Sequence, residues 1–239
     1  MRVQSWREGP HYVLYDADAM PQPRAALFDP DHWQAQGWLV GNAPGRGAVA
    51  FVRSGSETWA LRRYYRGGMV GRWIKQAYLW LGLERTRVWR EFKLTAHLHR
   101  LGLPVPVPVA AYVSRQGLRY GASLITVRIE DAQPLADYLV AQPLSLAQWS
   151  ELGATLRRFH EAGVRHDDIN ARNILRDAKG RFYLIDFDKA QLLPPGRWQK
   201  QNLARFKRSL EKFKTNTPGF HFEIKDWTAL LSGYSGVKR

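Results

Sequence analysis

Residues 164–190 read V-R-H-D-D-I-N-A-R-N-I-L-R-D-A-K-G-R-F-Y-L-I-D-F-D-K-A, and this stretch decides the fold. Its second half contains two short apolar runs, at 174–175 and 182–185. Between them, the sequence D-A-K-G at 177–180 is typical of a turn, because Asp and Gly favour the backbone angles that turns require. The second run is also rich in strand-forming residues. This half of the stretch therefore predicts a β-hairpin.

The expected hairpin brings three polar side chains together. Asn173 lies roughly opposite Leu184, and Asp186 then emerges beside the loop that carries Asp168. All three are hard oxygen donors, which suit Mg²⁺ bound together with substrate phosphates. We interpret Asn173 and Asp186 as metal ligands and Asp168 as the catalytic group that accepts a hydroxyl proton, as in phosphoryl transfer. The structural alternative is a set of ordinary surface turns, because Asp and Asn are common in any turn.

The same residues resemble two loops of the protein-kinase-like fold, in which H-R-D-x-x-x-x-N precedes D-F-G. Here the strings are H-D-D-I-N-A-R-N-I-L and L-I-D-F-D-K-A. In this longer form they resemble the lipopolysaccharide sugar kinases, and most of all those acting on the inner-core sugar Kdo (3-deoxy-D-manno-octulosonic acid). The resemblance covers residues 45–212. His166 is then expected to brace the loop through hydrogen bonds, and Asp167 replaces the arginine that reads a phosphorylated activation loop in other kinases.

The resemblance implies an α+β, two-lobed protein-kinase-like fold. Residues 1–128 would form a small, β-rich N-terminal lobe with a nucleotide-covering loop and a helix equivalent to the one that carries a conserved glutamate in kinases. Residues 129–239 would form a mainly helical C-terminal lobe with the catalytic and metal-binding loops. Residues 128–131 would be the hinge, whose backbone usually holds the adenine. The helical pattern at 145–163, which starts with a capping box, is expected to be a core helix behind the catalytic loop.

Four residues of the expected N-terminal lobe are candidates for nucleotide binding. Gly45 and Gly47 form a G-R-G turn that would let backbone N–H groups approach a phosphate. Arg62 falls where protein kinases carry the lysine of V-A-I-K, and an arginine can bind phosphate in its place. Arg63 is the alternative for that role. Glu91, on a helix expected at 86–101, would pair with Arg62 and orient it.

The composition indicates which class of molecule the protein binds. The chain has 36 Lys and Arg against 21 Asp and Glu, a net charge of +15, with ten Trp and ten Tyr. A polyanionic partner is expected, either nucleic acid or an anionic membrane or phosphorylated lipid, and composition alone does not separate these. There is no cysteine, no apolar run of transmembrane length and no signal-peptide pattern, so a cytoplasmic location is the default expectation.

Two segments concentrate the positive charge. Residues 62–100 hold ten Lys or Arg against two Glu, and residues 197–214 hold seven against one. Within the first, the aromatic stretch 72–83 is interpreted as facing a membrane or glycolipid, the alternative being a basic helix with its aromatics packed inward. The second is interpreted as an anion-facing surface near the acceptor site. The rest of the chain, 1–36 and 215–239, carries no clear chemistry.

Together these features predict an ATP- and Mg²⁺-dependent kinase. The resemblance implies that its acceptor is Kdo attached to a lipid A precursor, and that the protein acts as a peripheral protein on the anionic cytoplasmic face of the inner membrane. No nucleic acid partner is expected, and the sequence carries no signal for an oligomeric state. The alternatives are a heptose kinase of the same superfamily, an atypical protein kinase, an aminoglycoside-type phosphotransferase and, from a different class, a basic nucleic-acid-binding pseudokinase module.

Overall fold

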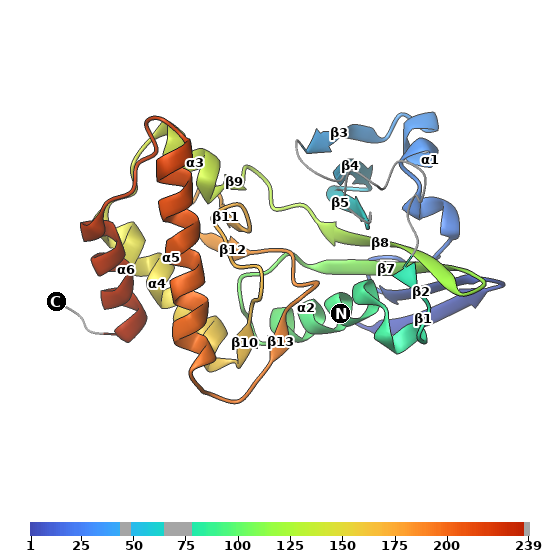
Figure 1. Cartoon of the computed structure of the whole chain (residues 1–239). Coiled ribbons are helices and arrows are strands. Elements are labelled where there is room, and N and C mark those ends of the chain that lie inside the picture. Colours follow the sequence, from blue (N-terminus) through green and yellow to red (C-terminus); the bar gives the residue numbers. More distant parts are fainter. Residues whose placement is uncertain (44–48, 65–77, 237–239) are drawn as a thin grey trace. The chain divides into compact units, whose positions relative to one another are not determined.

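The structure, a computed structural model, describes residues 1–43, 49–64 and 78–236. These residues divide into two compact units. The first comprises Met1–His99 and Pro106–Arg128, and the second comprises Arg100–Val105 and Ile129–Arg239. Figure 1 gives the element labels used below.

The first unit is built on an eight-stranded sheet whose paired neighbours are all antiparallel. Its strands are β1 (Val3–Glu8), β2 (His11–Asp16), β3 (Leu39–Ala43), β4 (Val49–Ser54), β5 (Glu57–Arg63), β6 (Tyr78–Leu79), β7 (Pro108–Gln116) and β8 (Arg119–Val127). They lie in the order β1-β2-β7-β8-β5-β4-β3, and β6 pairs with β8 off this path. The order places β5 and β8 in the interior of the sheet, where each has strands on both sides.

Both faces of this sheet are covered. Because successive strand residues point to opposite faces, Leu14 packs in the cluster that includes Phe92 of α2 (Arg87–Arg100), whereas Val13 packs with Trp33 of α1 (Pro30–Ala35) on the other side. The short 3-10 helix η1 (Ala25–Phe28) adds Phe28 to the second cluster. A second 3-10 helix, η3 (Leu83–Arg85), precedes α2.

The N-terminal region contains more regular secondary structure than its sequence indicates. The Asp29 side chain accepts a hydrogen bond from the Asp31 amide and so caps the start of α1. The hairpin of β1 and β2 was not expected. It extends the sheet by pairing β2 with β7 from Tyr15↔Ala110 to His11↔Ser114, so residues 1–16 belong to the core sheet.

The second unit is mainly helical. Its helices are α3 (Leu135–Ala141), α4 (Leu146–Glu161), α5 (Trp198–Asn216) and α6 (Ile224–Ser235), and its short strands are β9 (Gln133–Pro134), β10 (Val164–Arg165), β11 (Ile174–Arg176), β12 (Phe182–Leu184) and β13 (Gln191–Leu192). The strands form a three-stranded sheet in the order β12-β11-β9 and a β10–β13 pair. The expected α+β class is confirmed. In the described part of the chain, no helix is long and apolar enough to cross a lipid bilayer.

Helix α4 is the core helix that the sequence predicts. Ser145 and Gln148 form the capping box, with each side chain bonded to the other's backbone N–H. Four apolar residues along one side of the helix are buried, namely Trp149, Leu152, Leu156 and Phe159, whereas Leu146 is exposed. Helix α6 packs closely on α4 through Gly153 and Gly233, so residues 224–235 complete this unit.

Candidate active site

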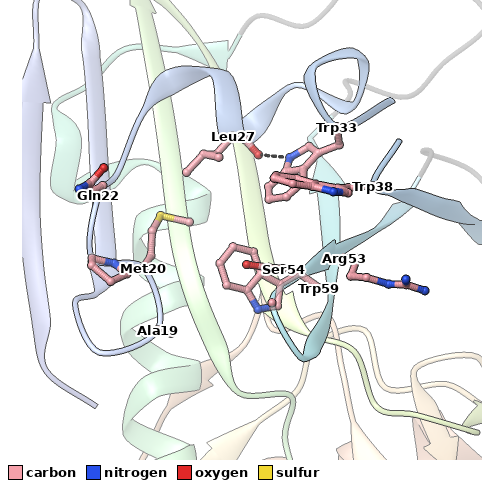
Figure 2. A pocket seen from close by; sticks show the side chains of 11 residues that line it. Ala19, Met20, Gln22, Leu27, Trp33, Trp38, Arg53, Ser54 and Trp59 are labelled. Atoms are coloured by element: carbon pink, nitrogen blue, oxygen red, sulfur yellow. Dashed lines mark hydrogen bonds between the residues drawn. The ribbon is translucent and has the colours of Figure 1, made fainter. Parts of the chain in front are cut away.

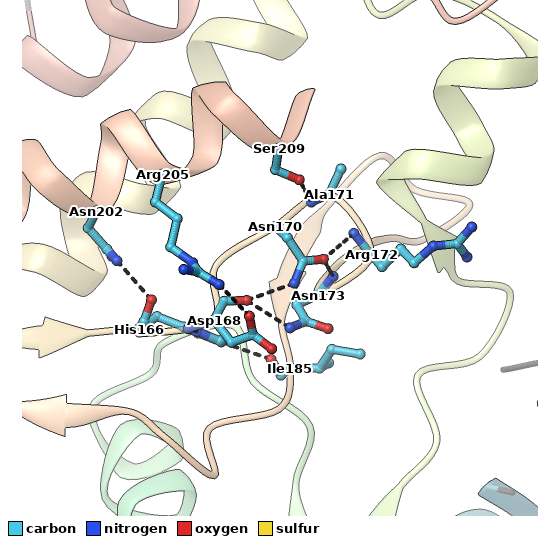
Figure 3. A network of polar contacts seen from close by, with 10 residues as sticks. All are labelled: His166, Asp168, Asn170, Ala171, Arg172, Asn173, Ile185, Asn202, Arg205 and Ser209. Atoms are coloured by element: carbon cyan, nitrogen blue, oxygen red, sulfur yellow. Dashed lines mark hydrogen bonds and ion pairs between the residues drawn. The ribbon is translucent and has the colours of Figure 1, made fainter. Parts of the chain in front are cut away.

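The loop between β10 and β11 is folded around the side chain of Asn170. Its Nδ2 donates to the carbonyl oxygen of Asp168 at 2.8 Å, and its Oδ1 accepts from the amides of Arg172 and Asn173 at 2.8 and 3.2 Å (Figure 3). The Nδ2 of Asn173 donates to the same Asp168 carbonyl at 2.9 Å. These bonds join both ends of the segment, so Asp168 and Asn173 lie together although they are five residues apart.

His166 braces this loop, as the sequence predicts. Its Nε2 lies 3.0 Å from the carbonyl oxygen of Ile185, and its Nδ1 lies 3.3 Å from the amide nitrogen of Asp168. A carbonyl only accepts and an amide only donates, so the ring is the neutral tautomer with its proton on Nε2. Burial lowers the pKa of His166, against the opposing effects of the Ile185 hydrogen bond and the charges of Asp186 and Asp168. The ring therefore joins the catalytic loop to the residue before Asp186.

The predicted hairpin is present, with a register one residue away from the expected one. Strands β11 and β12 pair with Ile174 opposite Leu184, and the Ile185 amide donates to the carbonyl oxygen of Asn173 at 3.0 Å. Asn173 thus lies opposite Ile185 instead of Leu184. Asp186 follows directly and has a φ of 66°, in the left-handed region that Asp adopts more readily than most residues. The hairpin therefore brings Asn173 and Asp186 to the same end.

The donor set at this end fits Mg²⁺. The side-chain nitrogen Nδ2 of Asn173 donates a hydrogen bond to the Asp168 carbonyl oxygen. The side-chain oxygen Oδ1 is therefore the atom that would bind a metal. Asp186 adds a carboxylate. The described residues contain no group of three or more His, Cys, Asp or Glu placed to hold a metal by themselves. A site with one carboxylate and one amide matches Mg²⁺, which keeps several waters and takes substrate phosphates as further ligands.

Helix α5 lies along the same loop. Three polar side chains at positions i, i+3 and i+7 of the helix, and so on one face, contact successive parts of the loop. Asn202 Nδ2 donates to the His166 carbonyl oxygen (2.8 Å), and Arg205 Nη2 donates to Asp168 Oδ1 (2.7 Å) (Figure 3). Ser209 Oγ accepts from the Ala171 amide (3.2 Å). The sequence predicts a basic helix near the acceptor site, but it does not indicate which of its residues contact the loop.

A chain of buried and partly buried hydrogen bonds links this face of α5 to α4 and α6. Because Asn202 donates its Nδ2 to the His166 carbonyl, its Oδ1 is the atom 3.1 Å from His160 Nε2, which must therefore carry the proton. His160 Nδ1 then accepts from the Tyr234 hydroxyl at 2.8 Å. Burial lowers the pKa of His160, with the Asn202 hydrogen bond opposing the shift. No periodicity in the sequence connects these four residues, so sequence reasoning missed the chain.

In the first unit, Arg62 forms the ion pair that the sequence predicts. Its Nη2 lies 2.5 Å from Glu91 Oε2, joining β5 to α2. The side chain of Glu91 is only 3% exposed, whereas that of Arg62 is 25% exposed. The hydroxyl of Tyr64 also bonds to Glu91 Oε2, and Arg62 Nη2 donates to that hydroxyl at 2.8 Å. Burial raises the pKa of Tyr64 well above its usual value, with the Arg62 charge opposing the shift.

The alternative arginine is occupied elsewhere. Arg63 Nη2 lies 2.6 Å from Asp29 Oδ1, before α1. Successive residues of β5 point to opposite faces, so Arg62 and Arg63 reach different partners. This arrangement favours Arg62 over Arg63 for the role next to Glu91.

Several expected site features lie outside the described residues. Gly45 and Gly47 are among these, as is the first half of the basic aromatic stretch 72–83, residues 72–77. At its described end, Tyr78 stacks on the ring of Tyr120, and Trp80 stacks on the ring of Tyr12 and meets that of Tyr120 edge-on. Leu79 and Leu81, which alternate with them, are exposed. The two described aromatic rings therefore pack inward.

The first unit also contains a pocket of about 600 Å³ lined by indole rings. Figure 2 shows Trp33, Trp38 and Trp59 around it, with Arg53 beside them. Trp33 is held by a hydrogen bond from Nε1 to the Leu27 carbonyl oxygen at 2.8 Å. Within the described chain, none of the site residues expected from the sequence lines this pocket.

Comparison with known proteins gives a consistent set of relatives. The model of the "Lipopolysaccharide kinase (Kdo/WaaP) family" matches residues 30–234. A 3-deoxy-D-manno-octulosonic acid kinase of Vibrio vulnificus is 40% identical over 232 residues, covering 97% of this chain and 98% of the relative. Proteins with the same name from Xanthomonas campestris and Stenotrophomonas maltophilia are 42% and 41% identical, covering 88% and 84% of this chain and 85% and 81% of the relatives.

Proposed function

The chain belongs to the lipopolysaccharide kinase (Kdo/WaaP) family, and from this premise we propose that it phosphorylates a hydroxyl group of Kdo on a lipid A precursor. The observation that carries the proposal is the similarity to 3-deoxy-D-manno-octulosonic acid kinases over almost the whole chain. Membership of a kinase family implies ATP as the phosphate donor. The reaction belongs to the synthesis of the lipopolysaccharide inner core.

In the proposed reaction, Asp168 is the general base. The acceptor hydroxyl oxygen attacks the γ-phosphorus of ATP, the bond from that phosphorus to the β,γ-bridging oxygen breaks, and ADP leaves. The hydroxyl proton passes to the Asp168 carboxylate as the new bond forms. The hydrogen bonds that Asn170 and Asn173 make to the Asp168 backbone carbonyl support this role, because they fix the backbone from which the carboxylate projects.

Asn173 and Asp186 are the residues that would hold Mg²⁺, through one amide oxygen and one carboxylate. When bound, the ion neutralises negative charge on the phosphates of the nucleotide. The hydrogen bonds of the β11–β12 hairpin support the assignment, because they fix the backbone positions of these two residues relative to each other.

Arg62 is proposed to bind the phosphates of the nucleotide, with Glu91 and Tyr64 orienting its guanidinium group. An arginine held by a buried carboxylate keeps other N–H groups available for phosphate oxygens. Gly45 and Gly47 are proposed to cover the same phosphates with backbone N–H groups. The two units correspond, in this proposal, to the small and large lobes of the kinase fold.

The surroundings of the acceptor follow from its chemistry. A lipid-linked sugar acid with phosphate groups is anionic and lies at a membrane surface. The net charge of +15 supports a peripheral association with an anionic membrane, and the basic helix α5 supports an anionic acceptor. We place this association on the cytoplasmic face of the inner membrane, where ATP is available.

The proposal is tested by incubating the purified protein with γ-labelled ATP, Mg²⁺ and a panel of acceptors. The panel contains a Kdo-bearing lipid A precursor, a heptose-bearing core, a generic protein, single-stranded RNA and no acceptor. We expect label on the Kdo glycolipid alone. Label on the heptose-bearing core alone would show that heptose, and not Kdo, is the acceptor. RNA binding without any phosphate transfer would support the pseudokinase alternative.

A further inference from the structure

Arg205 differs from the other α5 residues that contact the catalytic loop. Asn202 and Ser209 bond to backbone atoms of the loop, so they support its shape. Arg205 instead contacts the carboxylate of Asp168, with 2.7 Å between Nη2 and Oδ1. The side chain of Arg205 is 47% exposed and that of Asp168 is 36% exposed. This pair is therefore accessible from outside the protein, as an acceptor requires.

Both partners of this contact keep atoms that can form further hydrogen bonds. A guanidinium group has five N–H donors in a planar fork, and the bond to Asp168 uses one of its nitrogen atoms. A carboxylate has two oxygens, and Arg205 occupies Oδ1 only. Oδ2 can therefore accept a hydroxyl proton while the outer edge of the guanidinium group binds a second anion. Paired donors of this kind match the two oxygens of a carboxylate.

The expected acceptor supplies such an anion. A sugar acid carries a carboxylate that is ionised at neutral pH. A carboxylate that lies within the width of a sugar ring from the Asp168 carboxylate is a second group of like charge, which is unfavourable unless a cation lies between the two. Arg205 is a cation already bound to one of these two groups.

We propose that Arg205 binds the carboxylate of the acceptor sugar acid while it holds Asp168 in place. This inference rests on the proposed function, and it makes Arg205 a residue that selects an acidic sugar over a neutral one. The sugar is anchored by its carboxylate on Arg205, and one of its hydroxyl groups then lies against Asp168. A neutral sugar would lack the anchor, although the reaction at its hydroxyl group would be the same.

The test combines a change in the protein with a change in the acceptor. Steady-state kcat and KM are measured for wild type, Arg205→Gln and Arg205→Lys on two acceptors. One is the Kdo-bearing lipid A precursor, and the other is the same molecule with its carboxylate reduced to a primary alcohol. Lys179→Gln is the matched control, because Lys179 is an exposed cation in the turn at the far end of the β11–β12 hairpin.

On the acidic acceptor, we expect Arg205→Gln to lower kcat/KM by about 100-fold, mainly through KM, as for the loss of one partner of a hydrogen-bonded charge pair. Arg205→Lys should lose about 10-fold, because lysine keeps the charge without the planar fork. On the reduced acceptor, wild type and Arg205→Gln should differ by less than about 3-fold, because the glutamine amide can still donate a hydrogen bond to Asp168 and there is no substrate carboxylate to bind. Lys179→Gln should match wild type throughout, and KM for ATP should be unchanged.

Two results would overturn the inference. If Arg205→Gln lowers kcat equally on both acceptors, Arg205 acts on Asp168 alone and does not bind the substrate carboxylate. If wild type uses both acceptors equally well, the carboxylate is not recognised at all. Failure of the proposed function looks different, because wild type would then transfer no phosphate to either acceptor.

Discussion

Arg62 and Glu91 are 29 residues apart in the sequence and meet in an ion pair with 2.5 Å between Nη2 and Oε2. The pair joins an interior strand of the sheet to the helix that covers it. Glu91 also accepts a hydrogen bond from Tyr64, so one buried carboxylate serves two partners. Removing such a carboxylate leaves the charged and polar groups that it binds without their partner.

Glu91→Gln should therefore weaken both nucleotide binding and folding. We expect KM for ATP to rise about 10-fold, because Arg62 loses the group that orients it, and the free energy of unfolding to fall by about 2 kcal/mol. Steady-state kinetics and urea denaturation measure the two effects. The matched control is Glu84→Gln, which breaks an exposed pair with Lys93 and should change neither quantity much. Equal KM values for the two variants would contradict the role of Arg62.

Asp186→Asn should reduce the effect of Mg²⁺ on nucleotide binding. Asn is the appropriate replacement because Asp186 has a φ of 66°, which Asn adopts more easily than Ala does. Losing the one carboxylate of the proposed site should weaken ATP binding in the presence of Mg²⁺ by about 10-fold or more, with little change in its absence. Calorimetric titration of a non-hydrolysable ATP analogue, with and without Mg²⁺, measures this.

Asp167→Asn is the control for the metal site. Its carboxylate lies in the loop that carries Asp168 and Asn173 but is held by Arg165 at 2.6 Å, so its loss should leave the Mg²⁺ effect intact. If Asp167→Asn and Asp186→Asn weaken Mg²⁺-dependent binding equally, the assignment of Asp186 as a metal ligand is wrong.

Gly153→Ala should destabilise the second unit. A Cβ atom built at Gly153 lies 1.9 Å from the carbonyl oxygen of Leu230, which is backbone and cannot move aside cheaply. The two helices would have to separate, at a cost of about 1–3 kcal/mol. Gly196→Ala is the control, because its Cβ would meet the nearest atom at an ordinary 3.5 Å. Thermal melts should show a lower Tm for Gly153→Ala only, and equal values would argue against the close packing of α4 and α6.

The buried His160 should make stability depend on pH. Its pKa is lowered in the folded state by burial, so the unfolded chain takes up a proton first as the pH falls. Stability is thus retained above the unfolded pKa of about 6.5 and lost below it. Urea denaturation between pH 7.5 and 5.5 should show this loss in wild type and a smaller loss in His160→Gln. An identical slope in the variant would mean that other groups, such as His166, account for the whole dependence.

The hairpin that carries the site was predictable because its signals are local. The turn residues at 177–180 and the apolar runs beside them lie within about a dozen positions, so the pairing follows from short-range rules. The register was wrong by one residue, since the turn signal bounds a hairpin without fixing which residues pair. The Arg62–Glu91 pair was predictable only through the resemblance to kinases.

The contacts of α5 could not be predicted in the same way. Its sequence shows a basic amphipathic helix, but the direction that Arg205 faces depends on how α5 packs against the rest of its unit. The same holds for Asn202, whose amide joins His160 to His166 across separate elements. The β1–β2 hairpin was missed for a different reason, because its short strands include exposed and polar residues as well as apolar ones.

The most direct test of the central claim is the transfer rate of Asp168→Asn under single-turnover conditions, with labelled ATP, Mg²⁺ and the Kdo-bearing lipid A precursor. We expect the rate to fall by about 10²–10⁴-fold, while binding of the Mg²⁺–ATP analogue stays within about 3-fold of wild type, since the proposed partner of Asp168 is the acceptor hydroxyl group and not the nucleotide. A transfer rate equal to that of wild type would contradict the account, because the hydroxyl proton would then pass to some other group.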